Sequence, residues 1–200
     1  MKLLAFTDLH GDEIIINSLI AKAKRTNPDF LVCAGDISDF GSKLEKILKR
    51  FESLGIPMIL IPGNHEDPIG LKKISSKFEY IIYLNEGSYE LDDYVFFGYG
   101  DNVFAREDKY FEQLARRFAK TKEKNKKFIL LVHAPPHKTK LDLLPMIGHS
   151  GNKSIKKFIM SERPNLVICG HLHENFGVID KIGKNSMLVN PGAKGKIIEI

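Results

Sequence analysis

The chain has 200 residues, 43% of them apolar, which is enough to enclose a substantial core as one domain over residues 1–200. Its 30 Lys and Arg residues against 25 Asp and Glu residues give a modest charge of +5, which fits an anionic substrate but also many other basic proteins. No apolar run approaches the ~20 residues of a membrane span, and the N-terminus shows no signal peptide. We therefore expect a cytoplasmic protein with no membrane partner.

The first 61 residues alternate short apolar runs with helix-patterned stretches, which is typical of a layered α/β fold. We expect buried strands over residues 2–7, 30–34 and 58–61. A helix is predicted over residues 12–25, with Ile15, Leu19 and Ala23 on its buried face, ended by Asn27-Pro28.

A second helix is predicted to begin at Ser42, because Ser42 and Glu45 have the spacing of a capping box. Gly55 suits the position just after its end. The expected buried face consists of Leu44, Ile47, Leu48 and Phe51.

The middle of the chain is rich in aromatic residues. Residues 80–84, 89–91 and 94–99 are expected to form antiparallel strands and hairpins. Their aromatic side chains are explained most simply by core packing, and a homodimer contact stays open. A helix with Phe111 and Phe118 on its buried face leads into the lysine-rich stretch 120–127. We interpret that stretch as a solvated helix end, with contact to phosphate or nucleic acid as the alternative.

The last third continues the α/β pattern. The sequence predicts strands over 128–132 and 166–169 and near 176–180, 186–189 and 196–199. It also predicts a helix over 153–161. The two cysteines, Cys33 and Cys169, lie in apolar runs, so we expect small buried side chains and no disulfide.

Polar residues of the types that bind metals follow five of these apolar strands, and they include five of the seven histidines. The series is Asp8-Leu9-His10, Gly35-Asp36, Gly63-Asn64-His65, His133 and Gly170-His171-Leu172-His173. Because the carboxyl ends of parallel strands face one crevice, we expect these residues to meet there. The Gly-His-x-His segment must be a loop, since rings one residue apart would face opposite ways on a strand.

Two divalent cations about 3.5–4 Å apart repel each other, so an anionic group must lie between them. Asp36 is the natural bridge, using both carboxylate oxygens. Asp8, His10 and one histidine of the Gly-His-x-His pair can complete one site. Asn64, His133 and the other histidine can complete the second. This mixed nitrogen and oxygen ligation favours Mn, Fe, Zn, Ni or Co over Ca or Mg.

With these motifs the chain resembles the calcineurin-like metallophosphoesterase superfamily over nearly its whole length. The resemblance implies a four-layer αββα sandwich of two mixed sheets flanked by helices. It assigns Asp8, His10, Asp36 and His173 to one metal and Asp36, Asn64, His133 and His171 to the other. It also implies that His65 contacts the phosphate and protonates the leaving oxygen.

The expected activity is metal-dependent hydrolysis of phosphate esters by a hydroxide that bridges two metals, with manganese favoured. Asp36, Asn64 and His65 are the predicted catalytic residues: Asp36 pairs the metals, and Asn64 and His65 stabilise charge on the phosphate oxygens. The sequence Gly-Asn-His-Glu resembles that of small stand-alone members that include cyclic-nucleotide phosphodiesterases. A small phosphodiester, with nucleotides among the candidates, is therefore the expected substrate.

Several alternatives stay open. Within the family they are a phosphomonoesterase, a nucleotide pyrophosphatase or a nuclease, although nucleases of this kind usually carry further domains. The resemblance also includes one branch whose members keep the fold as a non-catalytic, protein-binding scaffold. Such members lose ligand histidines, and this chain keeps all of them.

Five further polar residues lie close to the motifs. His137 and His149 are interpreted either as exposed loop histidines or as substrate contacts. Asp39, Glu66 and Asp67 either orient the ligand histidines or are solvated.

Overall fold

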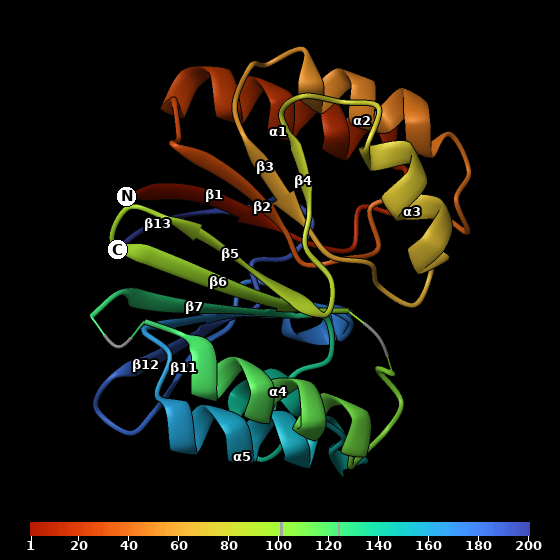
Figure 1. The fold of residues 1–200 in the computed structure, drawn as a ribbon. Helices are drawn as coiled ribbons and strands as arrows, with labels where there is room; N and C mark the ends of the chain where they lie inside the picture. The colour runs from red at the N-terminus through yellow and green to blue at the C-terminus, as the bar shows by residue number, and fades with distance from the viewer. Residues whose placement is uncertain (101, 124) are drawn as a thin grey trace.

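The computed structural model describes residues 1–100, 102–123 and 125–200 of the chain. Two mixed β-sheets lie face to face in the middle of the molecule, and helices cover the outer face of each sheet (Figure 1). The four layers confirm the predicted αββα sandwich.

The first sheet has five strands in the order β13-β1-β2-β3-β4. They are β1 (Lys2–Phe6), β2 (Phe30–Cys33), β3 (Met58–Leu60), β4 (Ile81–Tyr83) and β13 (Lys196–Glu199). Strands β1 to β4 run parallel, and β13 pairs antiparallel with β1 at one edge. The outer face is covered by α1 (Glu13–Thr26), α2 (Leu44–Glu52) and α3 (Pro68–Ser75).

The second sheet has six strands in the order β11-β12-β10-β7-β6-β5. They are β5 (Gly87–Leu91), β6 (Tyr94–Tyr99), β7 (Lys127–Val132), β10 (Leu166–Ile168), β11 (Ile179–Ile182) and β12 (Ser186–Val189). The four inner strands run parallel, and the edge strands β5 and β11 are antiparallel to their neighbours. Helices α4 (Lys109–Thr121) and α5 (Lys153–Glu162) cover its outer face.

The chain between β7 and α5 folds into a 3₁₀ turn and a small hairpin. These are η1 (Lys140–Asp142), β8 (Leu143–Leu144) and β9 (Gly148–His149), and a second 3₁₀ turn, η2 (His173–Asn175), follows β10.

Strand β1 shows how the sequence builds the layers. Leu3 and Ala5 pack into the cluster between the two sheets, whereas Leu4 and Phe6 pack into the cluster beneath the helices. All four side chains are fully buried. A strand buried on both faces must be apolar throughout, which explains why β1 is a continuous apolar run and not an alternating one.

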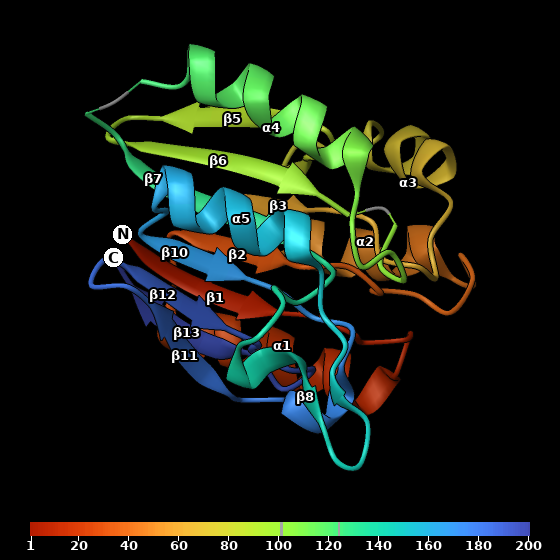
Figure 2. The same cartoon turned by 90° about the horizontal axis from the view of Figure 1, so that it is seen from below.

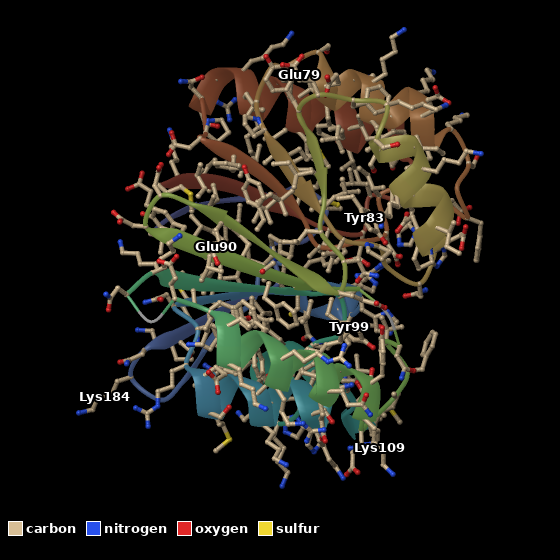
Figure 3. The ribbon with its side chains drawn as sticks, viewed as in Figure 1. Glu79, Tyr83, Glu90, Tyr99, Lys109 and Lys184 are labelled. Atoms are coloured by element: carbon tan, nitrogen blue, oxygen red, sulfur yellow. The ribbon has the colours of Figure 1, made fainter. Side chains whose placement is uncertain are left out.

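The carboxyl ends of the central strands of both sheets lie on one side of the molecule, as the strand directions in Figure 2 show. Tyr83 and Tyr99, the last residues of β4 and β6, lie on this side in Figure 3, opposite Lys184 in the β11–β12 turn. Backbone hydrogen bonds join the loops that follow: Asp8 N–H donates to the Gly35 carbonyl at 3.0 Å. The topology therefore brings the predicted metal ligands to one edge.

The predicted capping box at Ser42 is wrong. The Ser42 N–H, which a capping box would use, donates instead to the Asp39 carbonyl and closes a turn. Lys43 occupies the N-cap position of α2, and its side chain makes no cap hydrogen bond. Gly55 takes a φ of +63° two positions beyond the C-cap and not directly after it. The expected buried face of α2 is confirmed at Leu44, Ile47, Leu48 and Phe51. In α1, the fully buried face carries Ile16 with Leu19 and Ala23, while Ile15 is partly buried.

The prediction for residues 80–84 is also wrong. Strand β4 pairs in parallel with β3 in the first sheet, because α3, which the prediction lacked, carries the chain back across that sheet. Asp67 caps α3 by accepting from the Gly70 N–H, and Pro68 occupies its first turn. The hairpin of β5 and β6 is confirmed. Near the end of the chain, η2 occupies residues 173–175, so β11 starts at Ile179 and not near 176.

Three smaller expectations have mixed outcomes. Cys33 and Cys169 are buried and unpaired as predicted, and burial raises the pKa of both thiols. Phe96 and Phe97 pack in the core, in line with the simpler interpretation of the aromatic segment. In the lysine-rich stretch, α4 ends at Thr121 and Lys124 lies outside the described residues.

Within the described part of the chain, no helix combines the length and the apolar character needed to cross a membrane.

Candidate metal centre

The loops after five strands bring all eight predicted site residues together. Asp8 and His10 follow β1, Asp36 follows β2, Asn64 and His65 follow β3, His133 follows β7, and His171 and His173 follow β10. Six of them line an open pocket of about 370 Å³ together with Leu144, Leu172 and Glu174; they are His10, Asp36, Asn64, His65, His171 and His173. As predicted, the Gly-His-x-His segment lies in a loop and a 3₁₀ turn.

One group of ligand atoms is formed by Asp8, His10 and His173. The Nε2 atoms of His10 and His173 lie 3.3 Å apart, and His173 Nε2 lies 3.4 Å from Asp8 Oδ1. Two ligands bonded at about 2.1 Å to the same cation are separated by about this distance. The donor set of two imidazole nitrogens and a carboxylate therefore fits one divalent cation.

A second group is formed by Asp36, Asn64, His133 and His171. Asn64 Oδ1 lies 3.3 Å from His133 Nε2 and 3.0 Å from His171 Nδ1. His133 Nε2 lies 3.3 Å from Asp36 Oδ2. These four atoms fit a second cation beside the first.

Asp36 lies between the two groups. Its Oδ2 atom is 3.3 Å from His133 Nε2 and 3.9 Å from His10 Nε2. Its Oδ1 atom accepts the backbone N–H of His65 at 2.8 Å. A bridge through both carboxylate oxygens was expected from the sequence, and it stays a prediction; in the structure the Oδ2 atom is the one whose distances to both groups are short. Asp36 would therefore be the residue shared between two bound ions.

Four of the predicted ligands have backbone conformations that side chains rarely adopt. Asp8, His10, Asp36 and His171 have φ values of +55°, +45°, +52° and +70°. Such conformations cost on the order of 1–3 kcal/mol each and cluster at functional sites. The fold therefore holds these loops against their local preference.

Two glycines let the loops pass close to the ligands. A Cβ atom at Gly63 would lie 2.0 Å from Asp36 Oδ1, and one at Gly170 would lie 2.0 Å from Thr7 Oγ1. Thr7 in turn donates to Asp8 Oδ2 at 2.7 Å. Any larger residue at either glycine would displace a carboxylate of the site.

The family comparison bears directly on this arrangement. The model of the calcineurin-like phosphoesterase family matches residues 1–175. The chain belongs to the calcineurin-like phosphoesterase family.

Individual relatives agree with this assignment. An uncharacterized protein of Methanocaldococcus jannaschii is 32% identical over 99% of this chain and 91% of its own length. A probable cyclic nucleotide phosphodiesterase of Synechococcus is 26% identical over 80% of this chain, which spans 63% of that relative. The fold also matches a solved structure from Thermus thermophilus, with a TM-score of 0.79 and 17% identity over 96% of this chain and 90% of that one.

Enzymes of this phosphoesterase family use divalent metals, and a histidine binds such a metal in its neutral form. His133 Nδ1 lies 2.6 Å from the Ala34 carbonyl, which directs the other ring nitrogen, Nε2, toward the site. Burial and the neighbouring His133 lower the pKa of His171 to about 4. Burial works to lower the pKa of His133, but the hydrogen bond and charge of Asp36 raise it overall.

Glu66 holds the β2 and β3 loops together. Its buried carboxylate accepts the backbone N–H groups of Asp36 and Gly63, each at 3.0 Å, and that of Ser38 at 2.8 Å. Burial raises its pKa despite these bonds. Neither of the two roles that the sequence left open describes Glu66: it is buried, and it positions the backbone around Asp36 and not a histidine ring.

Replacing Glu66 with alanine is expected to lower the free energy of unfolding by about 3–5 kcal/mol, because three buried N–H donors lose their acceptor. Urea denaturation of metal-free protein measures this without a contribution from metal binding. Glu79→Ala is the control, since Glu79 is exposed (Figure 3) and its loss is expected to change stability by less than about 0.5 kcal/mol. Equal, small effects of both substitutions would show that Glu66 does not hold the loops.

Asp39 and Asp67 have different positions. Asp39 Oδ1 lies 3.1 Å from His65 Nδ1, so it can orient that ring, whereas Asp67 caps α3. Sequence patterns could not distinguish these two acids, because the capping role depends on a helix that those patterns did not predict.

His137 and His149 both flank Asp142, which is fully buried. His149 Nδ1 lies 2.8 Å and His137 Nδ1 lies 3.4 Å from its carboxylate. Burial acts to raise the pKa of Asp142, but backbone N–H groups of Thr139 and Gly151 lower it overall. This cluster organises the segment between β7 and α5, and neither histidine belongs to the two ligand groups.

Proposed function

We propose that this chain is a two-metal phosphoesterase that hydrolyses phosphodiesters. The observation that carries the proposal is Asp36 Oδ2, which faces both ligand groups, His10 on one side and His133 on the other. Asp8, His10, Asp36 and His173 would hold one divalent ion, and Asp36, Asn64, His133 and His171 the other. When bound, such ions lower the pKa of water and neutralise charge on the phosphate. Manganese is the ion we favour.

His65 is proposed to protonate the leaving oxygen. Asp39 lies against its Nδ1 atom, which leaves Nε2 to act toward the substrate. The ring of His65 also packs edge-on against that of His10, with centroids 4.5 Å apart. His65 is therefore adjacent to the first ligand group without being needed to complete it. Asn64, with its side-chain oxygen toward the second group, is proposed to stabilise the phosphate oxygens through its amide N–H.

The charge of the pocket supports a diester over a monoester. The described residues that line it include Asp36 and Glu174 but neither lysine nor arginine. The two ions would supply the positive charge of the site. Beyond them, a phosphomonoester dianion would find no lysine or arginine among these lining residues for its second charge, whereas a diester carries one charge only. The Synechococcus relative is named as a probable phosphodiesterase, which agrees with this preference. Among the described residues that line the pocket, none specifically favours a pyrophosphatase, a nuclease or a scaffold.

The test is hydrolysis of bis-p-nitrophenyl phosphate and p-nitrophenyl phosphate by metal-stripped protein titrated with Mn²⁺. We expect manganese to restore activity and kcat/KM to favour the diester. A preference for the monoester would overturn the diester assignment and leave the metal site intact. A cytoplasmic location and the assembly state stay predictions.

A further inference from the structure

Two phenylalanines place exposed rings against histidines of the pocket. Phe40 is 78% exposed and its ring centroid lies 4.3 Å from that of His65. Phe104 is 80% exposed and its ring lies 5.3 Å from that of His171. Because both histidines line the pocket, the two rings stand at its mouth on separate loops.

The backbone conformation of Phe40 is one that a bulky side chain rarely adopts, and core packing does not explain it because the side chain is exposed. Phe40 and Gly41 are the central residues of a tight turn, in which the Ser42 N–H donates to the Asp39 carbonyl at 2.9 Å. Their φ values are +48° and +76°, the signs of a type I′ turn. Gly, Asn and Asp dominate such turns, and a bulky residue there is strained. Phe40 is thus both strained and exposed.

A third ring provides a contrast. Phe176 lies 4.8 Å from His173, but it is only 37% exposed and packs against Gly192, where a Cβ atom would approach its ring to 2.8 Å. Packing accounts for Phe176. It does not account for Phe40 or Phe104, because most of each ring faces solvent.

We propose that Phe40 and Phe104 bind the planar ring of the substrate's organic substituent, and that the substrate is a nucleoside phosphoester. Aromatic faces stack on nucleobases with little dependence on the base, and removing such a ring weakens binding markedly. The polar pocket would receive the phosphate while the base lies on the rings outside it. The proposal rests on the phosphoesterase function proposed above and names its substrate class and two residues that determine specificity.

The test compares adenosine 5′-monophosphate with ribose 5-phosphate, in which a hydroxyl replaces the base. Both are monoesters of the kind that hydrolysis of a diester substrate would release as product. Their binding to manganese-loaded protein is measured by calorimetry. We expect the nucleotide to bind the wild type at least about tenfold more tightly. Phe40→Gly, which suits the positive φ, and Phe104→Ala are each expected to weaken nucleotide binding by about five- to tenfold and to leave ribose 5-phosphate unchanged.

Two further variants sharpen the test. Phe40→Tyr keeps the ring and should retain nucleotide binding, and Met160→Ala removes an exposed apolar side chain on α5 and should change neither ligand. The inference is wrong if the wild type binds both ligands with equal affinity, or if the Phe variants weaken the binding of both ligands equally, because the rings then do not contact the base. The proposed phosphoesterase site is tested separately in the same preparations: if manganese restores no turnover of bis-p-nitrophenyl phosphate, that site fails, whatever the rings bind.

Discussion

Replacing His65 with alanine is expected to lower kcat by about 10²–10⁴-fold on a diester with a poor leaving group, because the leaving oxygen loses its proton donor. The loss should be much smaller with p-nitrophenolate as the leaving group, since that anion needs little protonation. Steady-state kinetics on an alkyl and a p-nitrophenyl diester measure the difference. Asp39→Ala should give a weaker loss of the same kind, because Asp39 only orients the ring.

Metal content decides between two roles for His65. Its side chain could also join His10 and Asp36 in a ligand group, since one atom from each of the three lies within 4.8 Å of the others. We expect His65→Ala to keep the wild-type number of bound ions. Loss of one ion, or an equal rate loss for both leaving groups, would contradict the role as proton donor. Lys184→Ala is the control, because Lys184 lies on the opposite side of the molecule (Figure 3); this variant should keep the wild-type metal content and rate.

Replacing Asp36 with asparagine is expected to prevent pairing of the metals. Oδ1 of Asp36 accepts the His65 N–H, so an asparagine that keeps this bond must turn its NH₂ group toward His10 and His133. A hydrogen-bond donor would then replace the bridging oxygen. We expect at most one tightly bound ion per chain and a fall in kcat of about 10³-fold, equivalent to several kcal/mol of lost charge stabilisation.

The matched experiment for Asp36→Asn counts metal by elemental analysis after equilibrium dialysis, with circular dichroism to show that the variant is folded. Two ions retained at wild-type affinity, together with normal turnover, would show that Asp36 does not bridge them. Asp142→Asn is the matched carboxylate control: Asp142 is also buried but belongs to neither ligand group, so metal content should not change.

The sequence predicted the layered fold and the meeting of the motif residues for one physical reason. Apolar strands buried on both faces, such as β1, are continuous in the sequence, and the topology of parallel strands brings their ends to one edge. Asp8, Asp36 and His133 could therefore be placed together without knowing any loop conformation.

Other features depend on tertiary context that local patterns do not contain. The capping box at Ser42 has the right residues, but a turn at 39–42 takes up the Ser42 N–H. The role of Glu66 follows from three backbone donors on two loops that converge only in the fold. Likewise, the exposure of Phe40 could not be read from a sequence in which it is one apolar residue among many.

Two divalent ions, joined through Asp36, are proposed to carry the hydrolysis. The decisive experiment titrates metal-stripped protein with Mn²⁺ and follows bound metal and bis-p-nitrophenyl phosphate turnover in the same samples. We expect no turnover without metal and activity that reaches its plateau at two ions per chain. Full turnover in metal-free protein, or saturation with a single ion, would contradict the two-ion mechanism.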